Sequence, residues 1–154
     1  MSAKVAIVTG GGGSLGRATV VNLAARGLTV VAVDRNEQAL RELPDSVVRE
    51  AADTTDPNTA MSLVDRIAAE VGPPDILVNT IGAFRLGDAL NTTPEELQLM
   101  VDVNLGTALW LSQAAASHMQ QQVRVPSCTY PPVRESSQLA GWWLTASAKL
   151  LLST

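Results

Sequence analysis

The sequence predicts an α/β fold with a doubly wound parallel sheet, and three observations lead to this prediction. Short apolar runs alternate with segments of helical periodicity from the N-terminus to about Gln122. The first run, Val5-Ala-Ile-Val-Thr9, is apolar at every position but the last, as expected for a strand covered on both faces. Four consecutive glycines, 10–13, then allow a sharp turn into a helix. We expect right-handed crossovers and a sheet that is incomplete at its C-terminal side.

The elements are expected in a regular alternation. The first helix begins at Ser14, and its apolar stripe consists of Leu15, Ala18, Val21 (with Val20), Ala24 and Ala25. The elements that follow are a strand at 28–34, a helix at 36–43, a strand at 47–53, a helix at 57–71 and a strand at 75–79.

Two later helices carry clear start signals. Asp56 followed by Pro57 is typical of an N-cap and a first helical residue. Thr93-Pro-Glu-Glu96 has the pattern of a capping box with proline at the first helical position. The helix that begins there is predicted to run to about Met119, with a bend near Asn104 and Gly106.

Length and composition exclude several classes of protein. A chain of 154 residues, 46% hydrophobic and 17% charged, is typical of one soluble domain with a real core. A net charge of −4 argues against nucleic acid or an anionic membrane as partner. We expect no signal peptide, no membrane span and no metal site. The single cysteine, Cys128, excludes a disulfide within the chain and favours a cytoplasmic location.

The glycine-rich turn is the first candidate binding site. Gly11, Gly13 and Gly16 fit the G-x-G-x-x-G pattern. The free N–H groups at the start of the following helix, together with its dipole, suit a pyrophosphate. The next strand ends at Asp34, near the spacing at which a carboxylate meets the adenosine ribose hydroxyls of NAD.

Asp34 also bears on the choice between the two nicotinamide dinucleotides. Its carboxylate would repel a 2′-phosphate, which favours NAD over NADP, whereas Arg35 and Arg17 leave that choice open. The alternative is that Asp34 serves only as the N-cap of the helix beginning at Asn36.

Several positions, taken together, coincide with one family. Thr9-Gly10-(three residues)-Ser14-Leu15-Gly16 is similar to a TGxxxGxG turn, with Ser14 in place of the middle glycine. Asn79-Thr80-Ile81-Gly82 is similar to an NNAG segment that keeps only the first Asn and the Gly. With Asp53-Thr54 and Asn104 in addition, the chain from about Ala3 to Gln122 resembles the classical short-chain dehydrogenase/reductase family.

This resemblance implies a Rossmann-type fold for 1–122 and NAD(P)-dependent hydride transfer between a nicotinamide and a carbonyl or alcohol substrate. It implies that the intact protein is a homo-oligomer and that Asn104 belongs to the catalytic tetrad. The cofactor-binding residues that it implies, together with those argued above, are Gly10, Gly13, Ser14, Leu15, Gly16, Asp34, Arg35, Asp53, Thr54, Asn79, Ile81 and Gly82.

Structural alternatives stand beside these roles. Asp53 alone reads as a surface carboxylate at a strand end, and Asn79 as a residue that joins neighbouring loops. Asn104 alone reads as a helix-kink residue bonded to a nearby carbonyl. His118 lies near the end of the long helix, where a cation suits the dipole, and is given no catalytic part.

The resemblance stops after Gln122. The family uses a Tyr-x-x-x-Lys pair as its acid/base, with a Ser about a dozen residues earlier. Here the only tyrosine, Tyr130, is followed by two prolines and has Arg134 four residues on. Without a proton donor near the carbonyl, the chain as written is expected to be inactive.

A slip of the reading frame at about Val123 would explain the abrupt change. Taking the third base of each codon with the first two of the next permits Ser, Tyr and Lys at the junctions 130/131, 144/145 and 148/149. Their intervals, 14 and 4 residues, match the family. The alternatives are a splice variant or a divergent tail. We expect 123–154 to be an aberrant tail that is irregular or forms a short helix at 139–152, and the chain to be poorly stable.

Two other functions stay open at this stage. The first is a non-catalytic dinucleotide-binding or regulatory module that keeps the nucleotide site. The second is a protein-interaction fragment that uses Leu109, Trp110 and the Trp142-Trp143 patch.

Overall fold

The structure, a computed structural model, describes residues 3–84 and 90–122. The strands within these ranges are β1 (Val5–Thr9), β2 (Thr29–Asp34), β3 (Val48–Ala51) and β4 (Ile76–Asn79). The α-helices there are α1 (Ser14–Ala25), α2 (Glu37–Arg41), α3 (Pro57–Glu70), α4 (Pro94–Val101) and α5 (Thr107–Gln122), and a π-helical turn, η1 (Asp102–Gly106), joins the last two.

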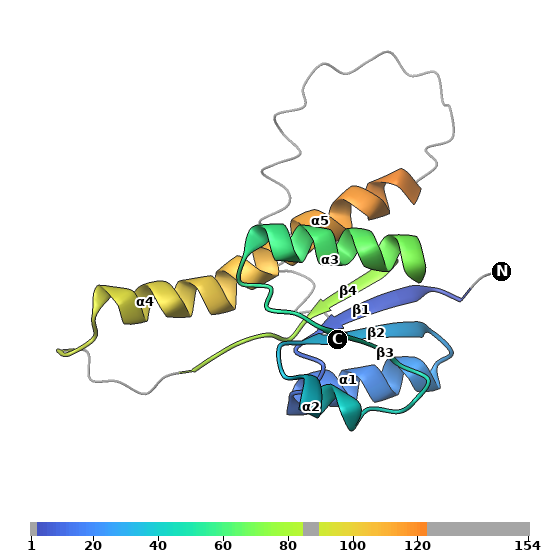
Figure 1. The fold of residues 1–154 in the computed structure, drawn as a ribbon, viewed down its shortest axis with the longest axis horizontal. Coiled ribbons are helices and arrows are strands. Elements are labelled where there is room, and N and C mark those ends of the chain that lie inside the picture. The colour runs from blue at the N-terminus through green and yellow to red at the C-terminus, as the bar shows by residue number, and fades with distance from the viewer. Residues whose placement is uncertain (1–2, 85–89, 123–154) are drawn as a thin grey trace, which may run out of the picture. The chain divides into compact units, whose positions relative to one another are not determined.

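The four strands form one parallel sheet in the order β3-β2-β1-β4. Helices α1 and α2 lie on one face of the sheet, and α3 and α5 on the other (Figure 1). The prediction of a doubly wound, Rossmann-type sheet is therefore confirmed for the described residues. After β3 the chain crosses to the far side of β1, so the strand order reverses between β1 and β4, where ligands bind in open α/β sheets.

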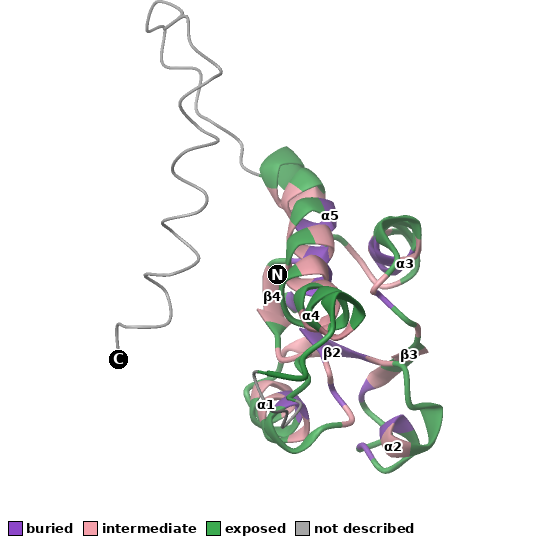
Figure 2. Cartoon of the chain, turned by 90° about the vertical axis from the view of Figure 1, so that its left-hand side faces the viewer, coloured by how far each residue is buried: buried purple, intermediate pink, exposed green. Residues whose placement is uncertain are grey.

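Both faces of β1 and β2 are buried, and their side chains alternate between two clusters. Ile7, Val31 and Val33 pack with α3 and α5, whereas Val8 and Ala32 pack with the α1–α2 layer. Figure 2 shows the buried sides of α3 and α5 facing each other. The continuous apolar run of β1 is thus explained by helices on both faces of the sheet.

Helix α1 buries only part of the predicted apolar stripe. Leu15 and Val21 are exposed, and the buried residues of the helix are Gly16 and Val20. The reason is that Gly16 packs directly on the glycine turn, which rotates the helix so that Val20 faces the sheet. Of the predicted stripe, Val20 and Ala24 therefore pack in the core as expected, whereas the prediction was wrong for Leu15 and Val21.

Two other predicted elements are shorter in the structure. The predicted strand at 47–53 pairs with β2 only from Val48 to Ala51, because β2 ends at Asp34, opposite Ala51. The predicted helix at 36–43 has Asn36 as its N-cap and ends at Arg41. Helix α3 begins where predicted, with Asp56 accepting a hydrogen bond from the Thr59 amide, although Met61 of its predicted apolar face is exposed.

The long C-terminal helix contains a π-helical turn where a bend was predicted. The capping box at its start is confirmed, since the Glu96 amide donates to Thr93 Oγ1 (3.3 Å) and the Thr93 amide to Glu96 Oε2 (3.2 Å). Within η1, Asn104 Nδ2 donates to the Met100 carbonyl (2.8 Å). The side-chain hydroxyl of Thr107 donates to the Val103 carbonyl (2.7 Å). These bonds satisfy carbonyls at the point where the helix changes its pitch.

In the part of the chain that the structure describes, β4 forms one edge of the sheet, and no helix has the length and apolar character needed to cross a membrane. The predicted helix at 139–152 and the tail expected to be irregular lie outside the described residues.

Two buried threonines give a matched stability test. Thr107 and Thr54 are 1% and 2% exposed, but only Thr107 has a hydrogen-bond partner for its hydroxyl among the described residues. Because an unmade buried hydrogen bond is costly, Thr107→Val should lower the free energy of unfolding by about 1–2 kcal/mol. Thr54→Val should leave it unchanged or raise it. Urea unfolding of both variants checks this, and equal losses would contradict it.

Candidate functional site

The carboxyl ends of β1, β2 and β4 meet at a cavity of about 290 Å³ beside the switch point. Eight of the residues predicted to bind the cofactor line it: Gly10, Gly13, Asp34, Arg35, Asp53, Thr54, Ile81 and Gly82. Ser14, Leu15 and Gly16 lie beside it in the first turn of α1, and Asn79 ends β4. The residues that the sequence singled out thus lie together at one edge of the sheet.

The glycine turn depends most strictly on Gly10 and Gly16. Gly10 has φ +67°, a left-handed conformation that favours glycine. A Cβ on Gly16 would lie 2.0 Å from the Gly10 carbonyl oxygen. Helix α1 therefore begins in direct backbone contact with the end of β1.

Three amides of the turn are engaged within the protein. The Gly11 amide donates to the Val33 carbonyl, and the Gly13 amide to the Gly10 carbonyl, both at 3.0 Å. The Gly12 amide donates to Asp34 Oδ2, also at 3.0 Å. Gly13 caps α1 without a side-chain hydrogen bond, and first-turn amides have no partner inside their helix. The amides of Ser14, Leu15 and Gly16 are therefore the ones that fit a diphosphate.

Asp34 lies at the end of β2 and is bonded through both carboxylate oxygens. Oδ2 accepts from the Gly12 amide, and Oδ1 accepts from the Asn36 amide (2.9 Å). The N-cap of α2 is Asn36, whose Oδ1 accepts from the Ala39 amide (3.2 Å). The alternative in which Asp34 caps this helix was therefore wrong.

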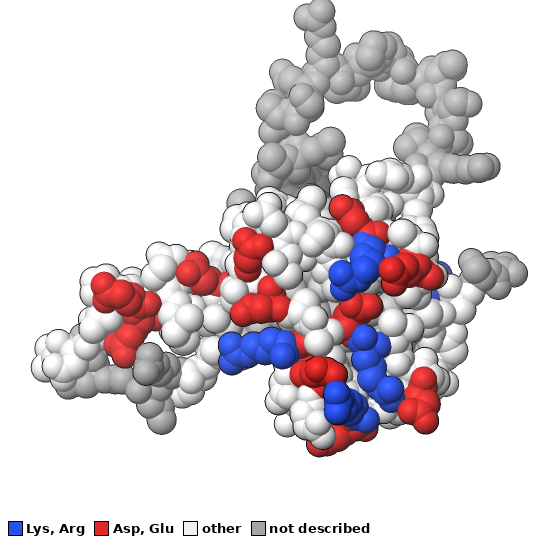
Figure 3. Space-filling view, viewed as in Figure 1, with Lys and Arg blue, Asp and Glu red and all other residues white. Residues whose placement is uncertain are grey.

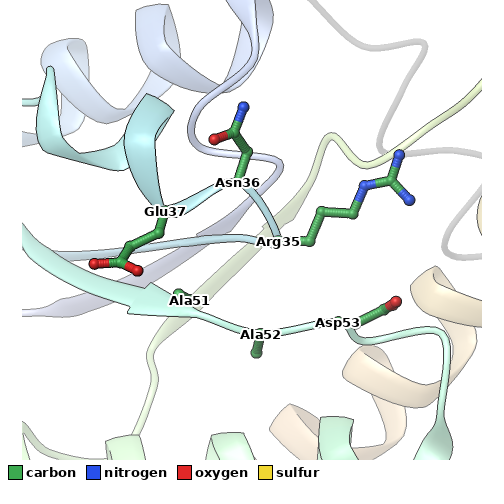
Figure 4. A pocket seen from close by; sticks show the side chains of 6 residues that line it. All are labelled: Arg35, Asn36, Glu37, Ala51, Ala52 and Asp53. Atoms are coloured by element: carbon green, nitrogen blue, oxygen red, sulfur yellow. The ribbon is translucent and has the colours of Figure 1, made fainter.

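The two arginines near the site differ in their surroundings. Arg17 donates to Glu42 Oε2 (2.7 Å) and to the Ala39 carbonyl (3.4 Å), so its guanidinium is held against α2. Arg35 instead lines an open depression with Asp53, and Figure 4 shows these two side chains extending to the same side while Glu37 points away. Arg35 is thus the cation that faces the candidate nucleotide site.

Asp53 is held as a carboxylate by its own turn. Its Oδ1 accepts from the Thr55 hydroxyl (2.7 Å) and the Thr55 amide (3.1 Å). These hydrogen bonds lower the pKa of Asp53, and the charge of Arg35 lowers it further. Asp53 is exposed, whereas the neighbouring Thr54 is buried with its hydroxyl unpartnered among the described residues.

Asn79 and Thr80 join β4 to its neighbours. Asn79 Oδ1 accepts from the Thr9 hydroxyl (3.2 Å), and its Nδ2 donates to Ser112 Oγ of α5 (3.3 Å). The Thr80 hydroxyl donates to the Thr9 carbonyl (2.6 Å). Asn79 therefore joins neighbouring segments, as expected from the alternative in which it has a structural role. Thr80 was missed as a site residue, although it stands at the second Asn of the NNAG-like segment.

Asn104 bonds entirely to backbone groups. Its Oδ1 accepts from the Ala83 amide (3.0 Å), and its Nδ2 donates to the carbonyls of Ala83 (3.1 Å) and Met100 (2.8 Å). It thus ties the segment after β4 to η1, and it makes the carbonyl bond expected of a helix-kink residue. Sequence reasoning also missed Met100, Val103 and Thr107, which line the cavity at helical spacing.

Several charged groups outside the cavity form ion pairs. His118 Nε2 lies 2.7 Å from Asp65 Oδ1, which links α5 to α3 and takes no part in the cavity. On the face shown in Figure 3, acidic and basic side chains are intermingled over the body of the domain, whereas the region of α4 at the left shows acidic side chains only. Three of the ion pairs are Arg66–Glu50, Arg49–Asp45 and Arg41–Glu37. In the described ranges, no three His, Cys, Asp or Glu side chains are grouped to hold a metal.

The fold and this site define an α/β protein with a dinucleotide-type glycine turn at its switch point. A family model described as short chain dehydrogenase matches residues 4–125. The chain therefore belongs to the short-chain dehydrogenase family, whose members are oxidoreductases that use nicotinamide dinucleotides.

Individual relatives agree with this assignment. A short chain dehydrogenase of Pseudocercospora fijiensis is 34% identical over 129 residues, which cover 77% of this chain and 41% of that protein. The short chain dehydrogenase/reductase dpmpG of Macrophomina phaseolina is 30% identical over 162 residues, covering 99% and 91%. A solved short-chain dehydrogenase from Streptomyces avermitilis matches with TM-score 0.73 and 31% identity, covering 78% and 46%. This chain thus spans less than half of the first and third relatives.

The close approach at the glycine turn yields a second stability test. Because a methyl group on Gly16 would collide with the Gly10 carbonyl, Gly16→Ala should lower the free energy of unfolding by about 3 kcal/mol. Gly106→Ala is the matched control, since its Cβ would meet its nearest neighbour at 3.4 Å, an ordinary contact. A glycine-to-alanine change inside a helix is neutral or favourable there. Urea unfolding measures both, and an unaffected Gly16→Ala would contradict the packing described.

Proposed function

We propose that residues 1–122 form the cofactor-binding part of a short-chain dehydrogenase/reductase, with NAD preferred over NADP. The observation that carries this proposal is the start of α1. Its first-turn amides are not capped by a side chain. They follow a glycine turn in which Gly16 packs on the Gly10 carbonyl and the Gly12 amide donates to the Asp34 carboxylate. This arrangement matches the diphosphate and ribose of a dinucleotide.

The other residues of the cavity fit the same ligand. In this proposal the adenine lies against Asp53, Thr54, Ile81 and Gly82, and Arg35 covers its open side. The preference for NAD follows because the Asp34 carboxylate would repel a 2′-phosphate, while Arg17 is already engaged by Glu42. Arg35 is the one described cation that would favour NADP in this depression, and Asp53 beside it offsets its charge.

The reaction proposed for the intact family protein is hydride transfer between the nicotinamide and a small carbonyl or alcohol substrate. The nicotinamide ring supplies the hydride. The protein binds and orients the reactants and excludes water from the site. Asn104 would act there as a positioning residue, because its side chain bonds to the backbone of Ala83 and Met100 beside the cavity. Within this proposal the intact protein is a cytoplasmic homo-oligomer.

We further propose that the chain as written does not turn over substrate, because residues 123–154 lack Tyr-x-x-x-Lys. The family match ends at residue 125, close to the point where the composition changes, which supports a frame slip near Val123. The relative that aligns over 99% of the chain instead favours a genuine divergent tail.

Nucleotide binding tests the first proposal. The purified 154-residue chain should enhance NADH fluorescence on titration and should bind NADH at least about tenfold more tightly than NADPH, since close like charges are worth more than 1 kcal/mol. Asp45→Ala removes a fully exposed carboxylate outside the residues that line the cavity, and this control variant should bind both nucleotides as the parent does. Failure to bind either nucleotide would contradict the proposal.

The coding DNA across Gln120 to Pro126 tests the proposal about the tail. A confirmed read identical to the translation would exclude a frame slip. If the slip is present, the corrected chain should reduce carbonyl substrates with NADH, whereas the chain as written should not. A corrected chain that binds NADH without turnover would instead favour a non-catalytic dinucleotide-binding module.

A further inference from the structure

The carboxylate of Asp34 faces two backbone amides from two different segments. One amide belongs to Gly12 in the glycine turn and the other to Asn36 at the start of α2. Hydrogen bonds from amides to a carboxylate are stronger than those between neutral groups. The Asp34 backbone is itself fixed, because its carbonyl accepts from the Ala52 amide at 3.1 Å. The side chain therefore extends from a rigid position.

Gly12 has little room to move from this contact. A Cβ placed there would lie 2.7 Å from Ala39 Cβ and 3.0 Å from Asp34 Oδ2. The turn thus lies close to the side chains of Asp34 and Ala39. Just after the first-turn amides, Arg17 of α1 donates to the Ala39 carbonyl and to Glu42. The chain is therefore bonded to Asp34 just before the first-turn amides and to α2 and its C-cap just after them.

From these contacts we infer that Asp34 is a positioning residue for the glycine turn, in addition to the ribose contact that the proposed function gives it. Its bond to Gly12 holds the turn in the conformation that presents the amides of Ser14, Leu15 and Gly16. Loss of the carboxylate therefore weakens binding of the diphosphate even in a ligand whose adenosine ribose offers no hydroxyl group. The inference deepens the proposed function and rests on it for the ligand.

Amide hydrogen exchange tests the positioning without any ligand. In the full chain, Asp34→Ala should speed exchange of the Gly12 amide about tenfold, as expected for loss of a charged hydrogen bond. The neighbouring Gly11 amide, which donates to the Val33 carbonyl, is the internal control and should exchange as before. Asp45→Ala removes an equal charge at a fully exposed position and should change neither rate. Unchanged exchange at Gly12 would overturn the inference.

Binding tests the coupling to the diphosphate. The ligands are NAD and an NAD analogue whose adenosine ribose lacks both hydroxyl groups. Asp34→Ala should lower the affinity for the analogue about tenfold and the affinity for NAD by more. If Asp34 only bound the ribose hydroxyl groups, the affinity for the analogue would not change. Asp34→Asn, which keeps the size of the side chain and one acceptor oxygen, should lie between Asp34→Ala and the parent. Urea unfolding of each variant establishes that the chain is folded.

The outcomes separate the two claims. If the parent chain binds neither NAD nor the analogue, the proposed function fails, and Gly12 exchange still decides whether Asp34 positions the turn. If the parent binds both ligands and Asp34→Ala leaves the affinity for the analogue unchanged, the inference fails while the proposed function stands.

Discussion

The contact between the Gly10 carbonyl and Gly16 is the constraint on which the site depends. It brings the first turn of α1 onto the end of β1, with no side chain between the two backbones. A longer side chain at position 16 would push the helix away from the strand and separate its free amides from the switch point. The same contact sets the rotation of α1, so that Val20 rather than Val21 reaches the core. The contact between Gly10 and Gly16 thus determines both how α1 packs on the sheet and where its free amides lie.

The sheet supplies the rigid base for this contact. β1 lies between β2 and β4, and helices cover both of its faces. It is therefore fixed by strands at both edges and by helices on both faces. Polar groups at the ends of the strands are then tied to one another. Thr80 donates to the Thr9 carbonyl, and Asn79 joins β1 to α5. These bonds hold the ends of the strands in place beside the cavity.

The sequence was informative wherever a local pattern had one physical cause. The buried run of β1, the glycine turn, the Asp56 cap and the capping box at Thr93 all depend on nearby residues, and each was predicted in place. Positions that depend on tertiary contacts were harder to predict. Leu15 and Val21 fit an apolar stripe as well as Val20 does, and only packing at Gly16 decides between them. In the same way, β3 ends at Ala51 because its partner strand ends, which no local signal in 47–53 could reveal.

The π-helical turn at Asp102–Gly106 determines the direction in which the residues before it face. Relative to an α-helix, such a turn contains one additional residue, which changes the angular phase of everything before it by about 100°. Met100 and Val103 can therefore border the cavity while Leu111 and Ala114 pack against α3 on the same continuous helix. A single-codon deletion in this stretch would restore ideal pitch but turn Met100 away from the cavity. The π-helical turn thus lets a single continuous helix face the cavity with its first part and the core with its second.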